Sequence, residues 1–250
     1  MAQILLVTLR EGIEMFLIVA IAAAYLRKTG RAALLPAVAW GTGAAVLISV
    51  VLGVWLAETA VTPKAESILA LIAAALIISM VFYMLRAAKQ MSGQIGIRLE
   101  AAVARPGAWV AVFSFVVFMI AREGMETAFI TASLFRQTET VPFVAGAIAG
   151  LVVAAGLAYA WSRYGHKVDL SLFFRVTSIF LLLFAVQLLV YAFHEATEAN
   201  LLPIDNAYWH IATEPYGPEG EYGALLTYAL VLVPAAWLAL SSMKQRTARA

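Results

Sequence analysis

The sequence Arg10-Glu-Gly-Ile-Glu-Met-Phe-Leu-Ile-Val-Ala20 recurs at a constant offset of 112 residues as Arg122-Glu-Gly-Met-Glu-Thr-Ala-Phe-Ile-Thr-Ala132. The two stretches align without gaps, and six of their eleven positions are identical. Chance similarity between two apolar helices would explain the shared Ile and Ala, but not a shared Arg-Glu-Gly-x-Glu. The recurrence therefore indicates an internal repeat that carries charged residues within apolar surroundings.

The composition around these motifs is that of a membrane protein. Of 250 residues, 63% are apolar and 13% are charged, against about 45–50% and 25% in soluble domains, and the mean hydropathy is +0.89. This composition disfavours a soluble enzyme, a nucleic-acid-binding protein and a disordered regulator. The absence of cysteine excludes disulfides, thiolate metal sites and iron–sulfur clusters. We therefore expect an integral membrane protein.

Seven stretches are long and apolar enough to cross a bilayer, for which an α-helix needs about 20 residues. They cover roughly residues 2–26, 34–57, 67–86, 108–135, 142–161, 171–193 and 223–241. The first is interpreted as a retained span, because the N-terminus lacks the basic head and the cleavage site of a signal peptide.

Basic residues are divided unevenly between the two sets of loops. Thirteen of the 17 Lys and Arg fall in segments 26–34, 86–107 and 161–175 and in the C-terminal tail, whereas the other loops hold only Lys64 and Arg136. Cytoplasmic loops carry the excess of basic residues. The pattern therefore predicts an all-α protein of seven transmembrane helices, with its N-terminus outside and its C-terminus inside.

The two copies of the motif lie in the first and fourth spans, so they run through the bilayer in opposite directions. This is typical of two inverted three-helix halves with a site near the midplane. The expected organisation of this single membrane domain is a first repeat over 1–107 and a second over 108–200. An acidic outer loop over 201–222 follows, and the seventh helix with a basic tail covers 223–250.

The charged residues of the motifs lie deep within their spans: Arg10 is about 13 Å into the first span, at 1.5 Å per residue, and Arg122 is near the middle of the fourth. The charged residues are Arg10, Glu11, Glu14, Arg122, Glu123 and Glu126. Each would cost about 2.5–3.5 kcal/mol at a helix centre, so they must be compensated. In each motif the Arg and the second Glu are spaced i, i+4 and can pair. If the motifs meet, four carboxylates and two guanidinium groups leave a formal charge of −2, which favours a hard cation with oxygen ligands.

The glycine of each motif, Gly12 or Gly124, lies between the two carboxylates and allows another helix to approach closely. The alternative to a cation site is a buried ion-pair network that only locks the two spans together, although apolar packing would do this without desolvating charges.

A second polar feature lies on the sixth span. Gln187, Tyr191, His194, Glu195 and Glu198 form one helical stripe toward the outer surface. We expect His194, Glu195 and Glu198 to form an outer cation site supported by Gln187 and Tyr191. Two alternatives are a simple polar cap of the helix and a zinc-enzyme site, although the second His of the H-E-x-x-H pattern is missing.

The doubled Arg-Glu-x-x-Glu motif and the seven spans resemble the high-affinity iron permease family, in its short bacterial form. The resemblance covers Arg10–Glu14, Arg122–Glu126 and the His194–Glu198 segment, and nearly the whole chain agrees in topology. It implies iron as the transported ion, commonly ferric iron, with the motif glutamates as ligands. It also implies the bacterial inner membrane and a separate ferroxidase or periplasmic iron-binding partner, with no prosthetic group, no nucleic acid and no enzymatic activity. The alternatives are another divalent cation (Mn, Zn or Pb) or an intramembrane metal-dependent enzyme.

Overall fold

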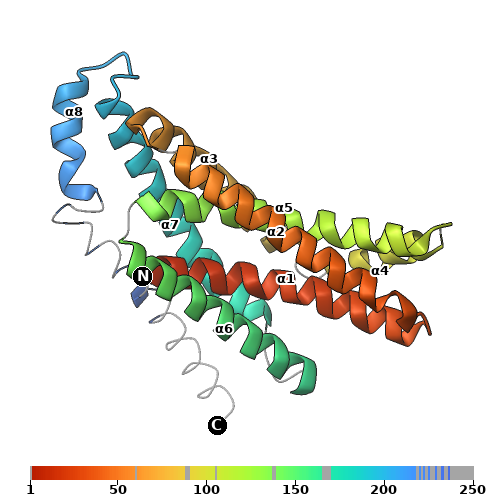
Figure 1. The fold of residues 1–250 in the computed structure, drawn as a ribbon. Helices are drawn as coiled ribbons and strands as arrows, with labels where there is room; N and C mark the ends of the chain where they lie inside the picture. The colour runs from red at the N-terminus through yellow and green to blue at the C-terminus, as the bar shows by residue number, and fades with distance from the viewer. Residues whose placement is uncertain are drawn as a thin grey trace, which may run out of the picture.

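Figure 1 shows the computed structural model, whose described residues are all helical or irregular and form no strand. Those residues are 2–59, 61–87, 91–104, 106–136, 139–164, 170–217 and the single positions 220, 222, 225, 229, 232, 233 and 236. The α-helices are α1 (Ala2–Lys28), α2 (Leu35–Thr59), α3 (Pro63–Ala87), α4 (Met91–Val103), α5 (Ala108–Arg136), α6 (Thr140–Tyr164), α7 (Leu170–Glu198) and α8 (Asn206–Thr213). Two short 3₁₀ turns, η1 (Ala32–Leu34) and η3 (Glu214–Tyr216), complete the described elements.

Five helices among the described residues are long and apolar enough to cross a membrane: α2, α3, α5, α6 and α7. Their apolar parts are 20–28 residues long, and 20 residues of helix span about 30 Å, the thickness of a bilayer's hydrocarbon core. Helix α1 has 27 residues but carries three charged side chains, Arg10, Glu11 and Glu14, in its N-terminal half. The membrane class predicted from composition is confirmed. The seventh predicted span, 223–241, lies largely outside the described residues.

The long helices cross-pack between the two parts of the chain that carry the motifs. Helix α2 lies along α5, α6 lies along α1, and α3 lies along α7. In Figure 1, α1 runs from the N-terminus at the left to the right, whereas α5 runs from right to left. The helix that follows each motif therefore packs on the helix that carries the other motif.

Small residues make this cross-packing close. They recur every four positions on both helices, as Gly41, Ala45 and Ser49 on α2 and as Gly146, Gly150 and Ala154 on α6. A Cβ added to Gly41 would lie 3.0 Å from Val116 Cβ on α5. One added to Gly150 would lie 2.6 Å from the Leu5 carbonyl oxygen on α1. The backbones approach more closely than larger side chains would permit.

The basic segment 86–107, expected to be a loop, contains helix α4. Ile95, Leu99 and Val103 repeat at intervals of four residues, and all three are buried against a cluster formed by α1, α2 and α5. Thirteen residues are too few to span a bilayer, so α4 caps one end of the bundle. The sequence-based assignment was wrong here because exposed polar residues interrupt the apolar positions.

The acidic segment 201–222 is also partly helical, since it contains α8 and η3. The Asp205 side chain caps α8 by accepting a hydrogen bond of 3.1 Å from the Tyr208 backbone N–H. This cap satisfies one of the unpaired donors of the helix N-terminus. Helix α8 packs against the C-terminal end of α7, at the upper left of Figure 1.

Candidate metal site

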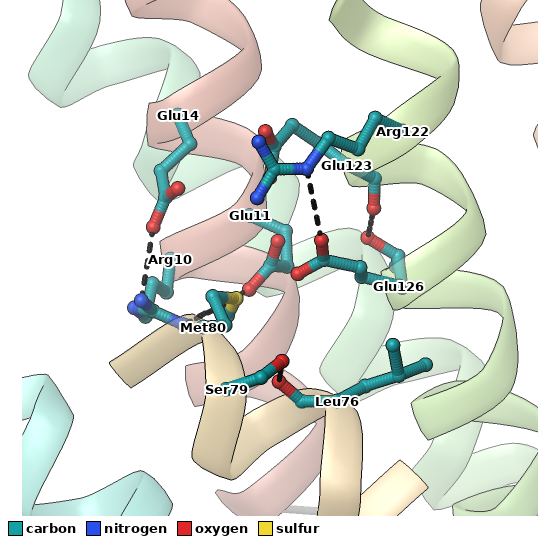
Figure 2. Close-up of polar contacts among 10 residues, drawn as sticks. Arg10, Glu11, Glu14, Leu76, Ser79, Met80, Arg122, Glu123 and Glu126 are labelled. Carbon is teal, nitrogen blue, oxygen red and sulfur yellow. Dashed lines mark hydrogen bonds and ion pairs between the residues drawn. The ribbon is translucent and has the colours of Figure 1, made fainter. Parts of the chain in front are cut away.

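The first motif is buried at the centre of the helix bundle. The Arg10 side chain has no exposed surface, and its guanidinium lies 3.2 Å from Glu11 Oε1 and 3.2 Å from Glu14 Oε1. Arg10 Nη1 also donates a hydrogen bond of 3.1 Å to Met80 Sδ on α3 (Figure 2). The i, i+4 pairing expected from the sequence is therefore present, and one cation is shared by two carboxylates.

The second motif has the same pairing in a more open setting. Arg122 Nε donates to Glu126 Oε1 at 3.3 Å, while 45% of the Arg122 side-chain surface is exposed. Its Cζ atom lies 5.1 Å from the centre of the Tyr83 ring on α3, in cation–π geometry. Glu123 and Glu126 are themselves buried. The second motif therefore has buried acids and a half-exposed base.

The two motifs meet between α1 and α5. In Figure 2 the carboxylates of Glu11 and Glu126 point toward one another across the space between the two helices. The carboxylates of the two motifs are close enough to repel one another, Glu11 with Glu123 and Glu126, and Glu14 with Glu126. In the described part of the chain, Glu11 Oε2 and Glu126 Oε2 are buried and accept no hydrogen bond. Such oxygens are costly to bury unless a cation or water satisfies them.

The motif glycines allow the neighbouring helices α6 and α2 to pack closely against α1 and α5. A Cβ on Gly12 would lie 2.9 Å from Ala154 Cβ of α6, and a Cβ on Gly124 would lie 2.7 Å from Ser49 Cβ of α2. Each motif helix is therefore pressed against a cross-packed neighbour at the residue between its two glutamates. This close approach holds the carboxylates on the opposite side, facing the other motif.

The polar stripe of α7 divides into separate environments. Gln187 is buried and accepts a hydrogen bond of 2.8 Å from Gln3 Nε2, which ties α7 to α1. Tyr191 donates a hydrogen bond to Glu66 of α3. Glu195 is buried and interacts with Tyr191. The structure thus places Gln187, Tyr191 and Glu195 inside the bundle.

His194 and Glu198 lie near the C-terminal end of α7 and face α8. Their ligand atoms and a ligand atom of His210 all lie within 4.8 Å of one another. The predicted trio of His194, Glu195 and Glu198 is therefore not brought together as one group, because Glu195 points into the bundle.

Sequence reasoning did not single out His210, Met80 or Glu66. His210 and Glu66 lie outside α7, and the sequence gives no sign that they contact α7 residues. Only the folded structure shows that His210 stacks on His194 and that Glu66 accepts a hydrogen bond from Tyr191. Met80 and Tyr83 are three residues apart on α3, which is a helical spacing. That spacing does not predict that Met80 contacts Arg10 or that Tyr83 contacts Arg122.

Comparison with known proteins gives one consistent result. Residues 1–211 match the Iron permease FTR1 family. The chain is 35% identical over 208 residues to a protein named ferrous iron permease EfeU from Yersinia pestis, with 76% of this chain and 71% of the relative covered. It is 33% identical over 202 residues to an Escherichia coli protein of the same name, with 76% and 73% covered. No solved structure shows a significant match. The matched region includes both motifs and extends past His210.

Proposed function

Because the chain belongs to the Iron permease FTR1 family, we propose that iron crosses the membrane through a site built by the motif glutamates Glu11, Glu14, Glu123 and Glu126. The protein is a multi-pass membrane transporter of iron. The observation that supports the glutamate site is the meeting of two acidic motifs between α1 and α5. Four carboxylates face only two guanidinium groups there, so the formal charge is −2 and attracts a cation.

The arrangement of the bundle suits a transporter built from two inverted halves. The halves are residues 1–107 and 108–200, and α1 and α5 occupy equivalent places in them. Cross-packing of α2 on α5 and of α6 on α1 supports this assignment, because a two-fold axis in the membrane plane would exchange these two pairs. Rocking of one half against the other would expose the glutamates first to one side and then to the other.

We propose ferrous iron as the ion at this site. Fe²⁺ would bring the formal charge of the four glutamates and two arginines to zero, and the relatives above are named ferrous iron permeases. Ferric iron, the sequence-based expectation, would leave a charge of +1. A membrane potential of 100 mV, inside negative, would contribute about 5 kcal/mol to the inward movement of two charges.

The membrane and the partners follow from the same assignment. We propose a bacterial inner-membrane location with the N-terminus outside, seven spanning helices and the C-terminus inside. No prosthetic group takes part, and a separate periplasmic iron-binding protein supplies Fe²⁺ on the outer side. A ferroxidase, the other partner that the resemblance implies, produces Fe³⁺ and would fit only the ferric alternative.

The direct test is iron uptake into proteoliposomes containing the purified protein. Glu14→Gln and Glu126→Gln each remove one negative charge while keeping the side-chain volume, and we expect each to lower uptake by at least about tenfold, since one charge-assisted ligand contributes roughly 1.5–3 kcal/mol. Glu100→Gln, an exposed glutamate on α4, is the matched control and should transport normally.

The same assay distinguishes the two oxidation states and the other cations. Uptake of ⁵⁵Fe should be higher with ascorbate, which keeps iron ferrous, than with ferric citrate. Uptake of manganese or zinc that depends on Glu14 and Glu126 and exceeds that of iron would overturn iron as the substrate. Unchanged iron uptake in both glutamate variants would overturn the glutamate site.

A further inference from the structure

The C-terminal end of α7 and helix α8 form a second polar site that is separate from the motif glutamates. Helix α7 ends in a Schellman turn, in which the Leu201 N–H donates to the Ala196 carbonyl at 3.0 Å and Asn200 adopts a φ of 53°. Asparagine is one of the few residues that adopts this left-handed conformation readily. The turn reverses the chain, and the Asp205 cap then starts α8 alongside α7.

Two aromatic contacts hold α8 in register with α7. The Trp209 ring packs edge-on against the Phe193 ring, with centroids 5.8 Å apart. The His210 ring stacks on the His194 ring, with centroids 4.4 Å apart and planes 21° apart. Glu198 lies one helical turn beyond His194 on the same face of α7. These contacts explain why three ligand atoms from two helices fall within 4.8 Å of one another.

A threonine hydrogen-bonds to His194. Thr213 Oγ1 lies 2.8 Å from His194 Nδ1, 2.8 Å from the Trp209 carbonyl oxygen and 3.3 Å from the His210 carbonyl oxygen. A hydroxyl that donates to a backbone carbonyl accepts from the protonated form of Nδ1. With its proton on Nδ1, His194 presents an unprotonated Nε2. Metal-binding histidines are oriented in this way, by a hydrogen bond from the ring nitrogen that does not bind the metal.

His210 and Glu198 offer the remaining donors. Within the described residues, His210 Nδ1 is a buried atom that makes no hydrogen bond. Glu198 is exposed, His194 and His210 are half-buried, and both Glu198 and Glu214 interact electrostatically with His194. The group is thus open to ions from the surrounding water and has an excess of negative charge.

We propose that His194, Glu198 and His210 bind one divalent transition-metal ion. Two imidazole nitrogens and one carboxylate are the donor set of several zinc and non-haem ferrous sites, whereas Mg²⁺ and Ca²⁺ prefer oxygen ligands alone. Donor atoms of one tetrahedral ion lie about 3.4 Å apart when the metal–nitrogen distance is about 2.1 Å. Binding of one ion therefore requires the two stacked rings, now 21° from parallel, to rotate, because the lone pair of each imidazole nitrogen lies in the plane of its ring.

This site differs in chemistry from the motif glutamates, which offer oxygen alone. Its nitrogen donors select Fe²⁺ over the abundant Mg²⁺ and Ca²⁺ before an ion reaches the carboxylates. Metal binding by His194, Glu198 and His210 does not depend on the proposed function. Only the selection of Fe²⁺ for transport rests on it.

The test is Co²⁺ binding to the full-length protein in nanodiscs, purified with an affinity tag that contains no histidine. Co²⁺ is the probe because its visible absorption reports nitrogen coordination, and calorimetry gives the affinity. We expect one Co²⁺ site with nitrogen ligands, weakened at least about tenfold by His194→Asn, His210→Asn or Glu198→Gln. Thr213→Val keeps all three ligands but removes the acceptor that orients His194, and it should weaken binding by a smaller factor.

Two controls make the outcome decisive. His166→Asn removes the only other histidine of the chain and should leave Co²⁺ binding unchanged. Because Glu198 is exposed, Glu198→Gln tests the site without disturbing the packing of α7 on α8. Wild-type Co²⁺ affinity in both His210→Asn and Glu198→Gln would overturn the proposal.

The glutamate variants separate this proposal from the proposed function. Glu14→Gln and Glu126→Gln should lose iron uptake and keep the Co²⁺ spectrum. Loss of the spectrum in these variants, with retention in His210→Asn, would place the nitrogen-ligated metal elsewhere. Retained uptake in the glutamate variants, together with Co²⁺ loss in the histidine variants, would overturn the glutamate path and keep the histidine site.

Discussion

The two copies of Arg-Glu-Gly-x-Glu share a sequence but not an environment. Arg10 has no exposed side-chain surface and forms ion pairs with both glutamates of its own motif. Arg122 is 45% exposed, and within the described residues its ion pair is with Glu126. On α3, Met80 accepts a hydrogen bond from Arg10, and the Tyr83 ring lies beneath Arg122. Helix α3 therefore contacts Arg10 through a hydrogen bond and Arg122 through a cation–π interaction.

A repeated motif therefore need not form a symmetric site in a single state of the protein. The charges of the α1 motif are enclosed by protein, while the arginine of the α5 motif reaches the protein surface. In a transporter with inverted halves, such asymmetry is expected whenever the site faces one side only. We therefore propose that the α1 motif contributes more to stability, and that the α5 motif contributes more to exchange of the ion with water.

Replacing the two arginines should have the largest and most unequal effects on stability. Arg10→Gln leaves Glu11 and Glu14 buried without their cation, and removal of one partner from a buried pair costs about 3–5 kcal/mol. Arg122→Gln removes a half-exposed pair, which is worth less than about 1 kcal/mol. We expect a large loss of Tm for the first variant and a small loss for the second, measured in detergent by thermal unfolding.

The control for this pair is Arg98→Gln, an exposed arginine on α4, which should unfold like the unaltered protein. Equal losses of Tm for Arg10→Gln and Arg122→Gln would mean that the two motifs are equally enclosed, contrary to the structure.

The motif glycines should show a smaller and more nearly equal effect. Gly12→Ala would bring its Cβ to 2.9 Å from Ala154 Cβ, and Gly124→Ala to 2.7 Å from Ser49 Cβ. Overpacking of this kind costs about 1–3 kcal/mol. We expect both variants to lose stability, with the larger loss in Gly124→Ala, as measured by thermal unfolding.

Compensating changes make the glycine prediction specific. Ala154→Gly should restore the stability of the Gly12→Ala variant, and Ser49→Gly should restore that of the Gly124→Ala variant. Ser49→Gly should not rescue Gly12→Ala, and Ala154→Gly should not rescue Gly124→Ala. Gly156→Ala on α6, where an added Cβ meets nothing within 4 Å, is the control. Rescue by the exchanged partners would contradict the cross-packing of α1 with α6 and of α5 with α2.

The smallest effects are expected at the α3 residues that serve the two arginines. Met80→Leu removes the acceptor of a buried Arg10 hydrogen bond, worth about 1 kcal/mol. Tyr83→Leu removes a cation–π contact at a half-exposed arginine, worth about 0.5–1 kcal/mol. Thermal unfolding of both single variants and of each combined with its arginine variant should give non-additive losses. Strict additivity would mean that neither side chain interacts with its arginine.

Much of the fold could be predicted because apolar length and motif repetition are local properties of the sequence. The spans around the two motifs and the i, i+4 pairing of Arg10 with Glu14 follow from helical geometry alone. Helix α4 was missed because its apolar positions are only Ile95, Leu99 and their neighbours within a basic segment. Its burial depends on helices that are distant in sequence.

The candidate sites were harder to predict from the sequence, because they too depend on contacts between helices that are distant in sequence. Spacing on α7 grouped Glu195 with His194, but adjacent residues on a helix face directions about 100° apart. The structure turns Glu195 toward the bundle and His194 toward α8. His210 could not be paired with His194 from sequence, because the Asn200 turn and the Asp205 cap together decide which face of α8 meets α7.

Whether the two motifs form one cation site between α1 and α5 can be measured by anomalous diffraction at the iron edge, from crystals soaked in Fe²⁺ under ascorbate. We expect a peak within about 2.3 Å of carboxylate oxygens from both motifs, including Glu11 and Glu126. A peak bound by one motif only, or iron found elsewhere while the space between the two carboxylates stays empty, would show that the motifs do not form a shared site.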